Sequence, residues 1–224
     1  ILFKDFRKFP IEENILKKDS KTLLAAESQQ REELIIQSDK QSEINDVIFA
    51  EGNVSFSYKG KLLKADNLTF DKLNKKVNAN GNIVLILGNQ IFQISKLEYS
   101  FISKKGYLLD VKGSINTNSL VEDLSPNFSQ IDLNKLESLL SLKKRVLHTP
   151  SKLENWLFLT DKISIDGKKW KSKKAIFSND LLELKQVKLE INSLEVFHID
   201  ETIRFNSSLN YLLLEEKISI PFWL

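Results

Sequence analysis

Apolar and polar residues alternate along several stretches between residues 35 and 118. Ile48, Ala50, Val54 and Phe56 share one parity, whereas polar residues such as Glu51 occupy the other. This period of two is typical of half-buried β-strands, because successive side chains of a strand point to opposite faces. Turn-forming residues separate the stretches, and the sequence between Leu87 and Ile91 carries the clearest hairpin signal, Gly-Asn. The pattern predicts a β-meander.

A short motif recurs within this region. Ala50–Val54 reads Ala-Glu-Gly-Asn-Val, and Ala79–Ile83, which begins 29 positions later, reads Ala-Asn-Gly-Asn-Ile. Val111–Ile115, with Val-Lys-Gly-Ser-Ile, is a weaker third copy. A period near thirty residues, with about two strands in each unit, predicts stacked β layers that share one core. The glycine inside each copy predicts a bend or a bulge.

The flanking regions have different patterns, and four segments follow from them. Residues 1–34 lack a clean period and are interpreted as a leader or linker with a short helix near 18–33. Residues 119–160 are predicted to be a helical insertion, because leucines at helical spacing over about 128–147 lie between two prolines. Alternation resumes over 161–224, a second β region after the first at 35–118.

Composition narrows the class of protein. The chain has 224 residues, of which 42% are hydrophobic and 28% charged, and this balance is typical of a folded chain rather than a disordered one. The net charge of +3 is too small to indicate a nucleic-acid partner for the chain as a whole. Cysteine is absent, which excludes disulfides, thiolate nucleophiles and cysteine metal sites. Methionine is absent even at residue 1, so we expect a processed product or a piece of a longer chain.

Residue types that usually carry catalysis are scarce. His148 and His198 have no partner at a metal-ligand spacing, so they are interpreted as structural, and no metal or cofactor is expected. No phosphate-binding glycine loop or nucleophile elbow occurs. The aspartates fall at strand ends and turns, where backbone hydrogen bonding explains them. The chain is therefore expected not to be an enzyme, although a carboxylate pair that converges in space stays open as an alternative.

One basic cluster surrounds Trp170. Its lysines could contact the phosphates of a glycolipid or a nucleic-acid strand. The simpler interpretation is a solvated hairpin whose tryptophan faces the core. The candidate phosphate contacts are Lys168, Lys169, Lys171 and Lys173.

Three segments of the chain resemble the OstA-like repeat of the lipopolysaccharide-transport proteins. They are Ala50–Val54, Leu63–Asp71 and Ala79–Ile83, which match the family pattern of Ala-x-Gly-Asn-Val followed by Ala-Asp and an aromatic-Asp pair. Ile36–Asp39 is similar to the opening strand of the family, and the stretch from Gln90 to Gly113 resembles a further unit.

The later part of the chain resembles one branch of this superfamily. Trp170–Asp180 is similar to a segment of the cyanobacterial branch of LptD, the outer-membrane lipopolysaccharide-assembly family. In that family the segment lies between the OstA-like repeats and a membrane barrel. Lys217–Phe222 resembles the approach to that barrel.

This resemblance implies a fold and a function. The fold would be all-β, an open twisted β-jelly roll of taco-like form with an apolar groove. The function would be to carry the acyl chains of lipopolysaccharide, or of a related glycolipid, at the periplasmic face of the outer membrane and to deliver them to the protein's own barrel. The strands near 35–45 would form an edge to which a periplasmic bridge protein adds a strand. The residues expected to line this groove are those at the inward-facing alternate positions of the early strands: Ile48, Ala50, Val54, Phe56, Ile83, Leu85, Phe92, Leu109, Val111 and Ile115.

Two other functions stay open on sequence grounds. A β-rich structural or adhesion module would use the same apolar stripes as an ordinary closed core. A polysaccharide-acting enzyme would require two carboxylates that converge in a cleft. The first alternative differs from lipid transport in whether the inward side chains can reach a lipid.

Overall fold

A computed structural model describes residues 34–124, 154–180, 186–199, 202–215 and 217–223. The chain divides into two compact units, Ile1–Arg31 and Glu32–Leu224. Every described residue belongs to the second unit. The helices expected near 18–33 and at about 128–147 lie outside the described residues. The fold given below is that of the second unit.

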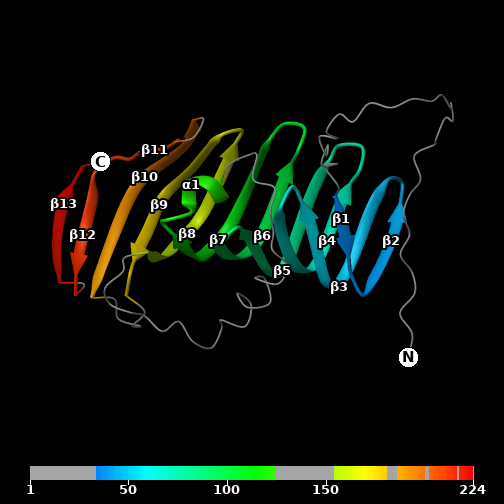
Figure 1. Cartoon of the computed structure of the whole chain (residues 1–224), viewed down its shortest axis with the longest axis horizontal. Coiled ribbons are helices and arrows are strands. Elements are labelled where there is room, and N and C mark those ends of the chain that lie inside the picture. The colour runs from blue at the N-terminus through cyan, green and yellow to red at the C-terminus, as the bar shows by residue number, and fades with distance from the viewer. Residues whose placement is uncertain (1–33, 125–153, 181–185, 200–201, 216, 224) are drawn as a thin grey trace, which may run out of the picture. The chain divides into compact units, whose positions relative to one another are not determined.

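The described part of this unit consists of antiparallel strands and one short helix, α1 (Leu120–Asp123) (Figure 1). All-β is therefore the correct fold class. The strands are β1 (Ile35–Gln37), β2 (Lys40–Ile44), β3 (Val47–Tyr58), β4 (Lys61–Asp71), β5 (Lys76–Leu87), β6 (Gln90–Ser100), β7 (Lys105–Asn116), β8 (Asn155–Asp166), β9 (Lys169–Ser178), β10 (Val187–Ile199), β11 (Thr202–Asn206), β12 (Asn210–Leu214) and β13 (Ile218–Phe222).

All thirteen strands that the structure describes belong to one sheet. From β3 to β10 the spatial order follows the chain order, so each strand pairs with the next (Figure 1). β7 pairs with β8 along its length, from Lys105 opposite Asp166 to Asn116 opposite Asn155. The two predicted β regions are therefore parts of one continuous sheet. Residues 155–160, which the sequence placed in the helical insertion, belong to β8.

The sheet is interrupted along a row of bulges. In β3 the pairing with β4 shifts between Glu51 and Val54, where Gly52 and Asn53 have φ values of 73° and 45°. In β5 the same shift occurs at Gly81 and Asn82, with φ values of 75° and 44°. Two copies of the sequence motif are thus bulges, as predicted. The third copy differs, because Gly113 pairs regularly with Phe92 and the positive φ belongs to Asp110.

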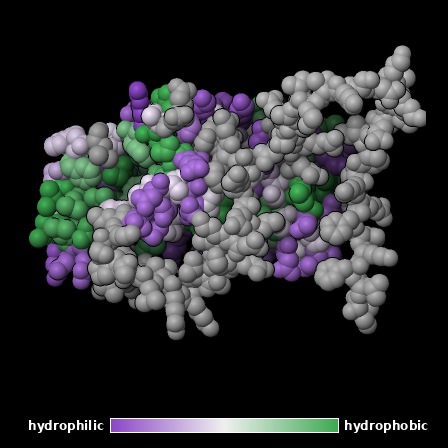
Figure 2. Space-filling model, viewed as in Figure 1, coloured by the Kyte–Doolittle hydropathy of each residue, from purple (hydrophilic) through white to green (hydrophobic). Residues whose placement is uncertain are grey.

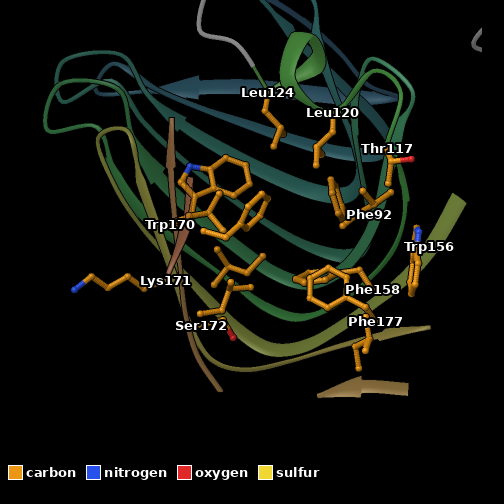
Figure 3. Close-up of a pocket in the computed structure, with 16 residues that line it drawn as sticks. Phe92, Thr117, Leu120, Leu124, Trp156, Phe158, Trp170, Lys171, Ser172 and Phe177 are labelled. Carbon is orange, nitrogen blue, oxygen red and sulfur yellow. The ribbon is translucent and has the colours of Figure 1, made fainter. Parts of the chain in front are cut away.

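In β4 and in each strand from β6 to β10, the positions that face the core change once from even to odd numbers or the reverse, at the level of these bulges. In β4, Leu63 and Ala65 are followed by two exposed residues and then by Leu68 and Phe70, all four being part of one core. The other strands repeat this step at positions that face one another through the pairing. Because a bulge bends its strand and increases the local twist, an aligned row bends the sheet as a whole. Figure 3 shows strands curving around the side chains of the concave face.

The concave face carries the main core. At the β3–β6 end, aromatic rings pack against one another, with Phe101 in contact with Phe56, Tyr58, Phe70 and Tyr99 at centroid distances of 5.0–6.4 Å. On the convex face a much smaller cluster consists of the cross-strand pair Leu62 and Ile86 with Val84. The core therefore lies on the inner side of the bend.

Candidate functional site

An apolar cavity of about 340 Å³ lies in the concave face, between β6 and β11 (Figure 3). Its size falls within the range of ordinary small-ligand pockets. Three of the sixteen lining residues are polar, Thr117, Lys171 and Ser172. The others are aromatic or aliphatic: Phe92, Ile115, Leu120, Leu124, Trp156, Phe158, Ile163, Trp170, Phe177, Leu189, Leu194, Val196 and Phe205.

The strands place these side chains through alternation on both sides of the bend. β8 directs Trp156 and Phe158 inward before its two exposed residues and Ile163 after them. β9 repeats the arrangement in the opposite chain direction, and β10 repeats it in the same direction as β8. Phe158 contacts the rings of both Phe92 and Phe177, at centroid distances of 6.2 and 5.1 Å. These ring contacts form the floor of the cavity.

Leu120 of helix α1 and Leu124, the C-cap of that helix, cover one side of the cavity (Figure 3). The position of α1 is fixed by Asp123, whose carboxylate is buried at 3% exposure. Asp123 Oδ2 accepts hydrogen bonds from the Asn89 backbone N–H at 2.8 Å, from Gln90 Nε2 at 2.7 Å and from Ser119 Oγ at 2.7 Å. A buried charge that accepts several hydrogen bonds is a strong anchor, because removing it leaves the donors unpaired.

Only two of the ten residues nominated from the sequence line this cavity, Phe92 and Ile115. Leu85 packs against the core beside them. The largest group lies in the core cluster at 1–8% exposure: Ile48, Ala50, Val54, Phe56, Ile83 and Val111. The inward parity of these six residues is thus correct, but they are packed against one another rather than against open space.

Leu109 was assigned to the wrong face. Leu108 belongs to the core at 3% exposure, and Leu109 pairs with Lys96 on the convex side. The reason is the irregular backbone at Asp110, whose φ of 50° lies where the core-facing parity of β7 changes between Leu108 and Val111 without a register shift. Simple alternation through residues 107–115 therefore fails at this point.

The sequence did not nominate the residues that form most of the cavity. Trp156 and Phe158 fell within the predicted helical insertion, and the β9 and β10 residues were expected to be strands without an assigned face. A signal was present nonetheless, because Trp156, Phe158 and Thr160 on one parity precede Ile163 and Ile165 on the other. This odd step is the same one that β4 shows between Ala65 and Leu68.

The lysine cluster lies largely on the convex face. Glu195 Oε2 and Oε1 each form a 2.9 Å ion pair, with Lys169 and Lys171 respectively. Hydrogen bonds from these two lysines hold the pKa of Glu195 below its ordinary value, and the same bond raises the pKa of Lys171. Figure 3 shows the Lys171 side chain pointing away from the cavity. Because Glu195 offsets part of their charge, these two lysines are weak candidates for phosphate contacts.

The remaining members of the cluster are placed differently. Lys173 is exposed on the convex side. The buried residues on either side of it in β9, Ser172 and Ala175, face the concave side. Lys168 lies in the β8–β9 turn and borders a smaller recess next to the cavity. Trp170 packs against the core and lines the cavity, so the hairpin interpretation is correct for this residue.

Within the described ranges, no group of three or more histidine, aspartate or glutamate side chains is arranged to hold a metal ion. None of the described helices has the length and apolar character needed to cross a membrane. No protein-family model matches the chain, and no curated protein matches its sequence.

Proposed function

We propose that this chain is a lipid-carrying domain of the OstA-like lipopolysaccharide-transport superfamily, most similar to the periplasmic domain of LptD. In this proposal it acts without catalysis at the periplasmic face of the outer membrane, where it binds glycolipid acyl chains and passes them to a β-barrel. The observation that carries the proposal is the apolar cavity in the concave face, bounded by β6–β11 and covered by α1.

The cavity is suited to hydrocarbon by its lining. The three polar lining residues contribute few hydrogen-bonding groups, so a sugar in the cavity would lose its hydration without compensation. An acyl chain gains about 0.8 kcal/mol for each buried methylene, so about twelve methylenes would contribute roughly 10 kcal/mol before ordering costs. A glycolipid can thus keep its sugar in water while its chains are shielded by the concave sheet.

The row of bulges supports the OstA-like assignment. Two of the residues that define the resemblance, Gly81 and Asn82, contact Asp66, which follows Ala in the intervening strand, and Gly52 and Asn53 contact Asp39 in the same way. A sheet bent along such a row is the backbone expected for an open, taco-like jelly roll. The motif residues therefore have a direct structural role in forming the concave surface that carries the cavity.

The two ends of the sheet suit the partners that the family would supply. β1 and β2 both pair with β3 and form one edge, and all five residues of β2 are exposed. This is the edge at which a periplasmic bridge protein would add a strand. β13 forms the other edge, where Figure 2 shows apolar residues gathered, including Ile218 at 58% and Trp223 at 76% exposure. A following β-barrel would continue from this end.

Photo-crosslinking in cells that make the intact protein tests the proposal. Phe205 on β11 lines the cavity and is 45% exposed, so a photoreactive phenylalanine analogue fits there. Phe197 on β10 is the matched control, because it lies on the convex face beneath the Lys169 ammonium group, 4.6 Å from the ring centroid. We expect glycolipid adducts at 205 and none at 197.

The same experiment addresses the main alternative. The densely packed β3–β6 half of the core, where most of the nominated residues are buried, is what a closed structural module would have throughout. Adducts at neither position, with the protein folded and present in the envelope, would favour that module over lipid transport. Equal adducts at both positions would indicate contact with the membrane surface rather than with a groove.

A further inference from the structure

A recess of about 80 Å³ adjoins the main cavity at the β8–β9 turn. Leu124, Trp170 and Val196 line both spaces, so the recess continues the cavity toward the turn. Its remaining walls include Lys168 and His198. The space therefore changes from apolar to polar along its length, as an amphiphile does.

His198 is the unusual residue of the recess. Both of its ring nitrogens, Nδ1 and Nε2, are buried and have no hydrogen-bond partner in the described part of the chain. Its backbone is held, since the His198 N–H donates a 3.0 Å hydrogen bond to the Lys168 carbonyl and the residue pairs with Ile203 of β11. A neutral imidazole carries one donor and one acceptor, and leaving both without partners costs free energy. Such a cost at a cavity wall is offset when a ligand supplies the partner.

Lys168 provides a positive charge at the wall of the recess. It is exposed at the turn and forms no ion pair among the described residues, in contrast to Lys169 and Lys171, which share Glu195. An ammonium group and an imidazole at one end of an apolar cavity match an anionic group attached to a hydrocarbon chain.

We infer that this recess is a headgroup subsite, in which His198 and Lys168 bind the anionic phosphate or carboxylate of an amphiphile whose chain occupies the main cavity. This inference rests on the proposed function, because it requires a chain in the cavity. It adds a position at which the amphiphile is fixed, and it selects anionic amphiphiles over neutral ones.

Isothermal titration calorimetry of the purified chain with three twelve-carbon amphiphiles tests the subsite. Dodecyl phosphate and dodecanoate carry the anion, and dodecanol is the neutral reference, all below their aggregation limits. We expect at least tenfold tighter binding of one or both anions than of dodecanol. The anion that binds more tightly identifies phosphate or carboxylate as the natural group.

The variants His198→Phe and Lys168→Gln should each reduce the preference for the anion at least fivefold and leave dodecanol binding unchanged. Lys112→Gln is the control, since Lys112 is exposed on the convex face of β7. His198→Phe should also raise the Tm of the free protein, because it removes two unpartnered nitrogens from a buried position. Lys168→Gln changes only an exposed turn, so it carries the test alone if the histidine variant fails to fold.

The outcomes separate the two proposals. Equal affinity of the wild-type chain for anionic and neutral amphiphiles would overturn the subsite and leave the lipid-carrying cavity intact. A preference for the anion that survives in both variants would likewise overturn it. Binding of none of the three amphiphiles would overturn the cavity's proposed function and the subsite with it.

Discussion

The side-chain amide of Asn82 donates a 2.8 Å hydrogen bond to the carboxylate of Asp66 on the neighbouring strand. Asn53 donates the equivalent bond to Asp39, also at 2.8 Å. Both asparagines follow a glycine of the repeated motif and have positive φ, a conformation that asparagine tolerates better than most residues. At the next bend, Ser95 Oγ and Asp110 Oδ2 form a 2.6 Å hydrogen bond in the corresponding place. The repeat thus encodes a hydrogen-bonded bend.

The glycines of the motif are required by this arrangement. A Cβ at Gly81 would lie 2.6 Å from Asp66 Oδ2, and φ there is +75°. Gly167 in the β8–β9 turn also has a positive φ, +62°, but nothing lies within 4 Å of its Cβ position. We therefore expect Gly167→Ala to cost about 1–2 kcal/mol for the backbone conformation alone. Gly81→Ala should cost about 3 kcal/mol or more, since steric displacement of the aspartate adds to that strain.

Urea unfolding of the two alanine variants measures this difference. Because both substitutions share the left-handed backbone, Gly167→Ala is the matched control. Equal losses of unfolding free energy would mean that the Asp66 contact contributes nothing and that the bend is not specified by the motif.

The motif also explains how far the sequence could predict this molecule. The bends at Gly52 and Gly81 were predictable because a glycine and an asparagine mark them locally. The bends of β8 and β9 are formed by Asp161-Lys162 and Lys173-Lys174, ordinary exposed residues without glycine. Alternation therefore gave the correct face on one side of such a bend and the wrong face on the other, as at Leu109.

The location of the cavity depended on pairings that no local pattern carries. β7 and β8 are adjacent in the sheet, yet 38 residues separate Asn116 from Asn155 along the chain. This pairing places Phe158 opposite Gly113, where the missing side chain leaves room for the ring of Phe92. A Cβ at Gly113 would clash with Phe92 Cδ1, so the cavity floor depends on a glycine that belongs only to the weakest copy of the repeat.

The anchor of α1 is the second testable feature. Asp123→Ala should lower the free energy of unfolding by about 3 kcal/mol, because three hydrogen bonds to a charged group are lost and buried Gln90 is left with fewer partners. It should also loosen Leu120 and Leu124 over the cavity, so binding of an environment-sensitive apolar dye should increase. Glu122→Ala, an exposed change in the same helix, is the control for both measurements. Unchanged dye binding in a destabilised Asp123→Ala protein would show that α1 does not restrict access.

The Glu195 ion pairs predict a dependence of stability on pH. The pKa of Glu195 is lowered from its ordinary 4.5 by hydrogen bonds from Lys169 and Lys171, so the folded state releases this proton more readily than the unfolded state does. The contribution of ionised Glu195 to the free energy of unfolding is therefore complete above pH 4.5. It is lost as the pH falls through the lower pKa of the folded state. We expect Glu195→Gln to be less stable than the wild type at pH 7. The gap between the two thermal unfolding midpoints should close on acidification, and a constant gap from pH 7 to pH 3 would contradict the assignment.

Occupation of the cavity by hydrocarbon predicts a dependence on chain length. Each added methylene should increase the affinity for a linear amphiphile about fourfold, from about 0.8 kcal/mol of transfer free energy, until the cavity of about 340 Å³ is filled. Val196→Trp, which extends into that space, should lower the affinity for the longest chains at least tenfold and shift the plateau to shorter ones. Phe197→Trp, a neighbouring change on the convex face, should leave the series unchanged. An affinity that rises with length equally in both variants would place the hydrocarbon outside the cavity, on the surface of the sheet.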